Sequence, residues 1–292
     1  MKRFNSVKLA SKLGVVGNLF LLIIKLCVGI MTKSRAMIAD ALNSAGDIIS
    51  SFMTFIGNKI ANIPKDEDHN LGHGKAEYIY SMLISNLMIL LSFVIFKDSI
   101  LSIINRNKYV FSYFLIVACI LTIIIKLILY IYTKFIYKKH KNLLIKACYM
   151  DHRNDILLTT LNLFSCVFSY HGIYFVDGIV GILISAWIFY TSCKLFKESY
   201  DVLMDKSISI ETKKEVLKII NNYKDIKMIK HFNSTPVGYK YQISFTIYVD
   251  GEFSTFKSHD IANSLEKEID RKIDDIYLTV IHVNPINLNN KS

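Results

Sequence analysis

The chain has 292 residues, of which 52% are hydrophobic and 20% are charged, with a mean hydropathy of +0.34 and a formal net charge of +11. Soluble domains carry about 25% charged residues, so this chain is short of the surface charge that a soluble protein needs. Its apolar content also excludes intrinsic disorder. The basic excess therefore points first to a membrane, whose cytoplasmic side retains Lys and Arg, and only then to a nucleic acid.

The sequence contains six apolar runs, and each is close to the 20 or so residues that a membrane-spanning helix needs. The first run is too long for a removable signal peptide and has no small-residue cleavage site. The second and fifth runs are more polar than the others. The six predicted spans are residues 13–31, 36–63, 78–96, 110–132, 144–169 and 175–196.

Basic residues predict the orientation of these spans, because Lys and Arg are retained on the cytoplasmic side. One cluster precedes the first span and a second lies between the fourth and fifth spans, whereas the opposite loops are poorer in Lys and Arg. Both termini are therefore expected in the cytoplasm. The compact layout without targeting extensions predicts the bacterial inner membrane. The clustered residues are Lys2, Arg3, Lys8, Lys12, Lys134, Lys138, Lys139 and Lys141.

The character of the chain changes after the sixth span. We therefore expect a transmembrane domain at residues 1–205 and a cytoplasmic C-terminal domain at 206–292. The second domain has no spanning segment, and its apolar periodicity predicts a small α/β fold. The predicted order is helix 211–223, strand 226–233, strand 239–249, helix 254–272 and strand 277–283.

Two of the predicted spans carry paired oxygen donors at helical spacing. Asn43 and Asp47 lie four residues apart in the second span, and Asp151 and Asp155 lie four residues apart in the fifth. An ionised Asp at the centre of a membrane helix costs about 2.5–3.5 kcal/mol, so these side chains must face a cavity, a partner or an ion. Their depth along each helix places both pairs near the middle of the membrane.

These donors predict a site for a divalent cation. Carboxylate and amide oxygens suit Mn²⁺, Mg²⁺ or Fe²⁺ better than thiolate sites do. Crowded carboxylates bind protons when no metal is present, so metal binding would release protons. The alternative is that the carboxylates cap helices or pair with Lys or Arg. Arg153 is the nearest basic side chain in sequence but lies off the acidic face, and His152 is expected to line the site.

Three sequence motifs together resemble those of the cation diffusion facilitator family. They are SRAMIADALNSAGD at residues 34–47, DHNLGHGKAE at 68–77 and DHRND at 151–155. The resemblance covers nearly the whole chain. It implies a homodimeric exporter of divalent metal with six transmembrane helices, a cytoplasmic ferredoxin-like or metallochaperone-like domain, and alternating access driven by proton antiport.

The same resemblance implies where the metal binds. The transport site falls on Asn43, Asp47, Asp151 and Asp155, and the absence of a His from this set resembles the manganese-exporting branch. Zn²⁺ or Fe²⁺ efflux by the same fold is the alternative. The metal is the transported substrate, and no cofactor is expected.

Further sites are also implied by the resemblance. A loop site falls on Asp66, His69 and His73, and a site between protomers falls on His231, His259 and His282. Solvent-exposed or structural histidines are the alternative in both places. Thr246 and Asn284 depart from the family pattern at the second site. Lys75 and Asp205 fall where the family can form a salt bridge.

Two rival functions belong to other classes. A membrane metalloenzyme would use the Asp residues to hold a catalytic ion, but the sequence has no HExxH motif, P-loop or nucleophile–base pair. A metal sensor would use the C-terminal domain to signal to a partner. We therefore expect a transporter and not an enzyme, with metal ions, protons, lipid and a second copy of the chain as partners, and no nucleic acid.

Overall fold

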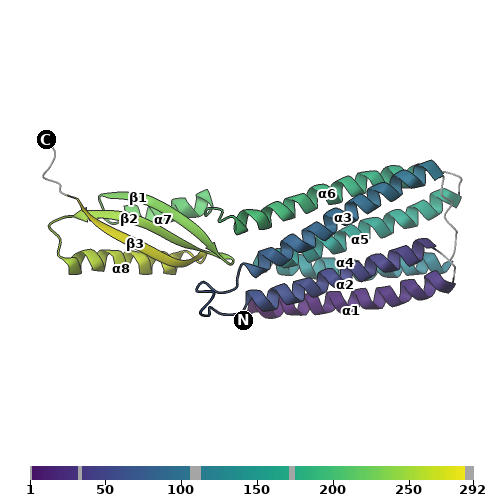
Figure 1. Ribbon diagram of the computed structural model, residues 1–292, viewed down its shortest axis with the longest axis horizontal. Helices are drawn as coiled ribbons and strands as arrows, with labels where there is room; N and C mark the ends of the chain where they lie inside the picture. Colours follow the sequence, from purple (N-terminus) through teal and green to yellow (C-terminus); the bar gives the residue numbers. More distant parts are fainter. Residues whose placement is uncertain (1, 32–34, 106–112, 171–174, 287–292) are drawn as a thin grey trace. The chain divides into compact units, whose positions relative to one another are not determined.

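The structure is a computed structural model, and it describes residues 2–31, 35–105, 113–170 and 175–286. The chain forms two compact units (Figure 1). The helical unit contains Met1–Ile63 and Ala76–Tyr200, and the α/β unit contains Pro64–Lys75 and Asp201–Ser292. The segment 64–75 therefore belongs with the C-terminal part of the chain, although it lies between two helices of the helical unit.

The long helices of the helical unit run side by side (Figure 1). Three segments, Arg3–Met31, Ala76–Ile104 and Ile116–His140, are long and apolar enough to cross a membrane. The expectation of a helical membrane unit followed by an α/β unit is confirmed. The helices are α1 (Lys2–Met31), α2 (Arg35–Ala61), α3 (Ala76–Asn105), α4 (Tyr113–His140), α5 (Leu143–Tyr170) and α6 (Phe175–Leu203).

The helical unit is apolar outside and rich in small polar residues inside. Large apolar side chains such as Val16, Phe93 and Ile128 are more than half exposed. Many of the buried hydroxyls donate to carbonyls of their own helix, as Thr122 Oγ1 does to the Ala118 oxygen at 2.8 Å. This distribution is the reverse of that in a soluble protein, and it fits helices that meet through small residues and face lipid.

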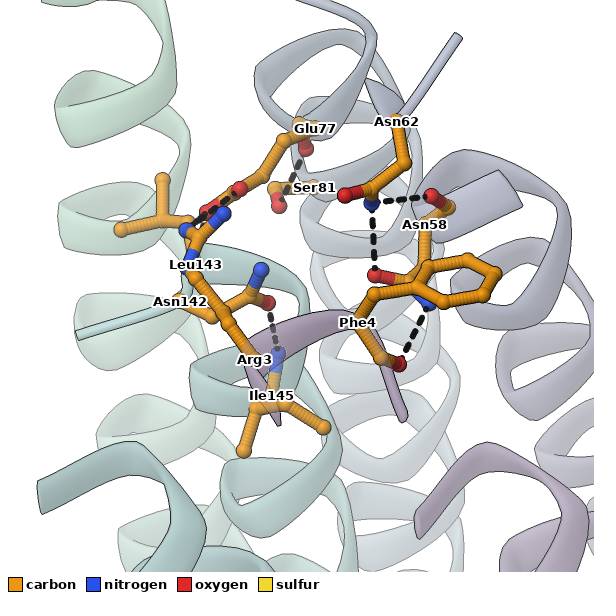
Figure 2. Close-up of polar contacts among 9 residues, drawn as sticks. All are labelled: Arg3, Phe4, Asn58, Asn62, Glu77, Ser81, Asn142, Leu143 and Ile145. Carbon is orange, nitrogen blue, oxygen red and sulfur yellow. Dashed lines mark hydrogen bonds and ion pairs between the residues drawn. The ribbon is translucent and has the colours of Figure 1, made fainter. Parts of the chain in front are cut away.

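Polar contacts tie several helices together near the start of the chain (Figure 2), where Asn58 of α2 also donates to the Phe4 oxygen of α1 at 3.2 Å. Arg3 of α1 donates two hydrogen bonds from Nη2 to the carboxylate of Glu77, at 3.0 and 2.7 Å. The same carboxylate accepts the backbone N–H of Leu143 at 2.8 Å, which satisfies a free donor at the start of α5. Asn142 caps this helix by accepting the N–H of Ile145. Glu77 therefore links α1, α3 and α5.

The α/β unit contains a three-stranded sheet with the order β1-β2-β3. β1 (Met228–Val237) pairs antiparallel with β2 (Lys240–Asp250), and β2 pairs parallel with β3 (Ile276–Ile286). The parallel pair needs a crossover, which α8 (Thr255–Lys272) supplies. α7 (Ile210–Asn221) precedes the sheet, and both of these helices begin at a serine cap, Ser209 or Ser254.

The core of the α/β unit lies between its two helices and the central strand. Val216 of α7, Phe245 of β2 and Leu265 of α8 are almost completely buried in one apolar cluster. β1 continues past the predicted end at residue 233, through Pro236, to Val237. β1 can include a proline because it is an edge strand, and the N–H groups on its outer side have no neighbouring strand to bond.

The Glu77 cluster generates a prediction about stability. In Arg3→Met the buried carboxylate of Glu77 loses its cationic partner, so we expect the protein to lose about 2–3 kcal/mol of stability. Thermal unfolding in detergent micelles would measure the loss. Lys206→Met is the control, because Lys206 pairs with Asp201 at the surface and is 62% exposed, where a pair contributes less than about 1 kcal/mol. Equal effects of the two substitutions would contradict this account of Glu77.

Candidate metal centre in the helical bundle

Asp47 of α2 and Asp155 of α5 meet on one lysine. Lys126 of α4 donates from Nζ to Asp47 Oδ2 at 2.7 Å and to Asp155 Oδ2 at 2.5 Å. The side chain of Lys126 is fully buried, and those of the two aspartates are 5% and 6% exposed. Three helices thus bring two carboxylates to a single point inside the bundle, close enough to share one cation.

Asp151 and His152 extend this cluster along α5. One ligand atom from each of Asp151, His152 and Asp155 lies within 4.8 Å of the others, and all three residues are buried. Nδ1 of His152 has no hydrogen-bond partner in the described part of the chain. The i, i+4 spacing of the two aspartates places them on one face of the helix, and His152 adds an imidazole beside them.

Of the four predicted metal donors, the structure describes the side chains of three. Asp47, Asp151 and Asp155 are buried in the bundle, with Asp47 and Asp155 joined through Lys126. Asn43 belongs to α2, one turn before Asp47, but its side chain lies outside the described residues. The alternative, that the carboxylates pair with a basic residue, is found at Asp47 and Asp155. Their partner is Lys126, which was not among the basic residues expected from the sequence.

Sequence reasoning missed Lys126, although a signal was present. It is a single lysine in the middle of the predicted span 110–132, where a charge is expensive and usually functional. Lys25 of α1 is a similar case, since it is buried and donates to Ser44 Oγ on α2 at 3.0 Å. The expected basic candidate, Arg153, instead lies against the Trp187 ring, with 5.6 Å to the ring centroid.

Asp66, His69 and His73 come together in the segment 64–75. Asp66 Oδ1 lies 3.1 Å from His69 Nδ1, and Asp66 Oδ2 lies 3.5 Å from His73 Nε2. A ligand atom from each lies within 4.8 Å of the others. The backbone N–H of His69 donates to Asp66 at 2.6 Å, and this bond is the main reason that the pKa of Asp66 is lowered. A lowered pKa keeps the carboxylate ionised and able to bind a cation.

Contacts within the α/β unit hold this segment in place. Gly74 packs against Gly238 in the turn between β1 and β2, where a Cβ on Gly74 would lie 2.6 Å from the Gly238 Cα. Gly238 also has a φ of +61°, which favours glycine. Lys75 pairs with Asp205 at 2.8 Å. The loop that carries the two histidines is therefore fixed to the α/β unit by backbone contact and by an ion pair.

The three histidines of the predicted site between protomers lie on separate elements of the α/β unit. His231 sits at the irregularity between Lys230 and Asn233 of β1, with a φ of +53°. His282 of β3 lies opposite Thr246 of β2, and His259 belongs to α8. All three are exposed. They are not among the described clusters of three or more metal-binding side chains.

Comparisons with known proteins identify the class of protein to which this chain belongs. Residues 11–204 match the cation efflux transmembrane domain, and residues 208–286 match the cytoplasmic domain of cation efflux proteins. The chain therefore belongs to the cation efflux family. Members of this family are transporters and not enzymes, and the metal is their substrate.

Curated relatives match the chain over nearly its full length. The manganese efflux system protein MneP of Bacillus subtilis is 29% identical over 280 residues, which cover 94% of each chain. MneS, a manganese efflux system protein of the same organism, is 26% identical and covers 98% of this chain and 99% of its own. The cation-efflux pump FieF of Shewanella oneidensis is 24% identical, covering 96% and 94%. This chain is thus a multi-pass membrane protein that acts in metal efflux.

Proposed function

We propose that the protein exports Mn²⁺ from the cytoplasm in exchange for protons, by alternating access to a site made of Asn43, Asp47, Asp151 and Asp155. One observation carries this proposal. Asp47 and Asp155, from two different helices, both contact the ammonium of Lys126 inside the bundle. Transporters place their substrate sites in such positions, where the two halves of the fold can move around them.

The chemistry of the site supports manganese. Three carboxylates are hard oxygen ligands, which suit Mn²⁺. The full-length similarity to MneP and MneS, both named for manganese efflux, supports the same cargo. The charge of the site supports exchange with protons. Three neighbouring carboxylates in a buried site repel one another, so they bind protons when no metal is present and release them when a metal binds.

Zn²⁺ or Fe²⁺ is the second candidate cargo, and His152 is the observation that favours it. Its imidazole lies beside Asp151 and Asp155 and has no described partner at Nδ1. An imidazole nitrogen suits Zn²⁺ and Fe²⁺, whereas Mn²⁺ prefers oxygen ligands. The number of oxygen donors outweighs this single nitrogen, so manganese remains the first choice.

Two further metal sites form part of the proposal. Asp66, His69 and His73 are close enough to bind one ion with mixed carboxylate and imidazole ligands. His231, His259 and His282 are exposed on separate elements, so a site there needs side chains from a second copy of the chain. The match to the cytoplasmic domain of cation efflux proteins supports a homodimer.

The placement in the cell follows from the distribution of basic residues. We infer that both termini face the cytoplasm and that the protein resides in a bacterial inner membrane, with domains at residues 1–205 and 206–292. Lys and Arg clusters at the N-terminus and between α4 and α5 support this orientation.

Flux measurements test the proposed function. Purified protein in lipid vesicles should carry Mn²⁺ in a protein-dependent manner, and faster when a pH gradient drives proton exchange. Asp47→Ala and Asp155→Ala should each lose at least about 90% of the flux, since each removes a carboxylate that no neighbour replaces. Asp98→Asn is the matched control, because Asp98 is exposed on α3. Full flux in both alanine variants would overturn the site, and insensitivity to pH would overturn proton exchange.

The identity of the cargo is tested at Asn43. In Asn43→His an amide oxygen is exchanged for an imidazole, which suits zinc, so the ratio of Zn²⁺ to Mn²⁺ flux should rise by about tenfold, equivalent to about 1.4 kcal/mol. The same vesicles loaded with either metal give the ratio directly. An unchanged ratio would mean that Asn43 is not a selectivity ligand.

A further inference from the structure

The ammonium of Lys126 sits on the two oxygens that a transported metal would use. Lys126 Nζ lies 2.7 Å from Asp47 Oδ2 and 2.5 Å from Asp155 Oδ2, and the whole side chain is buried. Lys126 therefore binds the carboxylates in the way that a substrate cation would.

We propose that Lys126 is a built-in competitor of the transported metal: a divalent cation must displace its ammonium from Asp47 and Asp155, and the ammonium returns when the cation leaves. This inference rests on the proposed function, because it takes these carboxylates as metal ligands. It adds Lys126 as a residue that sets both the affinity of the site and its selectivity among ions.

Displacement follows from the charges and the space. A divalent ion coordinated by either oxygen of these carboxylates would lie within a few ångströms of the ammonium, in a site from which water is largely excluded. Like charges repel strongly at such a distance in a low dielectric. The flexible four-carbon stem of lysine allows the ammonium to withdraw, and it projects from α4, whereas the carboxylates belong to α2 and α5.

The competitor also discriminates between ions by charge. A monovalent ion carries the same charge as the ammonium, so it gains no electrostatic advantage by replacing it. The ammonium is attached to the protein and so acts at a high effective concentration. A divalent ion has twice the charge and gains more from the carboxylates. Lys126 therefore favours divalent cargo over Na⁺ and K⁺.

The returning ammonium has a second consequence for transport. An exporter must change conformation after it has released its cargo, with its carboxylates again in the apolar part of the membrane. Buried charges without partners are costly there. Lys126 compensates part of this charge at Asp47 and Asp155, so the metal-free transporter can reorient with a smaller penalty.

Binding measurements on the full-length protein test this inference. Titration calorimetry with Mn²⁺ in detergent gives the dissociation constants of Lys126→Met, Lys126→Gln and Lys126→Arg relative to the parent protein, all in an Asp66→Ala background that removes the proposed loop site. The two neutral variants should bind Mn²⁺ about tenfold more tightly or better, whereas Lys126→Arg keeps the positive charge and should not. Lys126→Gln retains a hydrogen-bond donor in case Lys126→Met does not fold. Lys134→Met is the matched control, because Lys134 lies two turns along α4 and donates to Tyr130 Oη.

The outcomes separate this inference from the proposed function. A merely structural Lys126 predicts weaker binding in the neutral variants, because the carboxylates would lose their position. Unchanged or weaker binding in a folded Lys126→Gln protein would thus refute displacement, while flux that depends on Asp47 and Asp155 would leave the proposed function intact. If Asp155→Asn in the same background binds Mn²⁺ as tightly as the parent protein, the metal site itself is wrong and the inference fails with it.

Discussion

The shared ion pair of Lys126 with Asp47 and Asp155 is the interaction on which the interpretation of this transporter depends. Three helices contribute one charged group each to a point inside a bundle whose outer surface is apolar. Burying these charges is costly, and the cost is offset only when opposite charges meet with good geometry. A bundle that needed nothing but stability would use apolar residues here. The burial of these charges therefore supports the proposal that this point is a functional site.

The rest of the helical unit allows this polar centre to exist. Small hydroxyl residues are common in the interior, and many of them donate to carbonyls of their own helix, as Thr122 does to the Ala118 oxygen, so that the helices can pack closely. The Glu77 cluster fixes α1, α3 and α5 near the start of the chain. α2 and α4, which carry Asp47 and Lys126, are not joined by that carboxylate. α2 is instead joined to α1 in the same region, where Asn58 Nδ2 donates to the Phe4 oxygen at 3.2 Å.

Periodicity was enough to predict most of the architecture. The apolar pattern predicted all three strands of the α/β unit, and the predicted helix 254–272 matches α8 to within one residue. The i, i+4 spacing of Asp151 and Asp155 predicted that both share one face of α5, because spacing within a helix depends on local geometry alone. Both kinds of prediction concern residues that are neighbours along one element.

Contacts between elements were harder to foresee. Nothing local in the sequence pairs Lys126 with Asp47, which lies 79 residues away. The approach of Gly74 to Gly238 joins the histidine-bearing loop to the α/β unit, and a lone glycine does not reveal its partner. Asn43 was assigned to the site by its spacing from Asp47 and by resemblance, and its side chain lies outside the described residues. The parts that escaped prediction are therefore those that depend on tertiary packing.

The location of bound manganese tests the central claim most directly. Crystals of the full-length protein grown with Mn²⁺ would show the ion through its anomalous scattering. We expect one peak coordinated by Asp47, Asp151 and Asp155, with the ammonium of Lys126 moved off both carboxylates. A bundle with no such peak, or with manganese bound only at Asp66, His69 and His73, would contradict the assignment of the buried aspartates as the transport site.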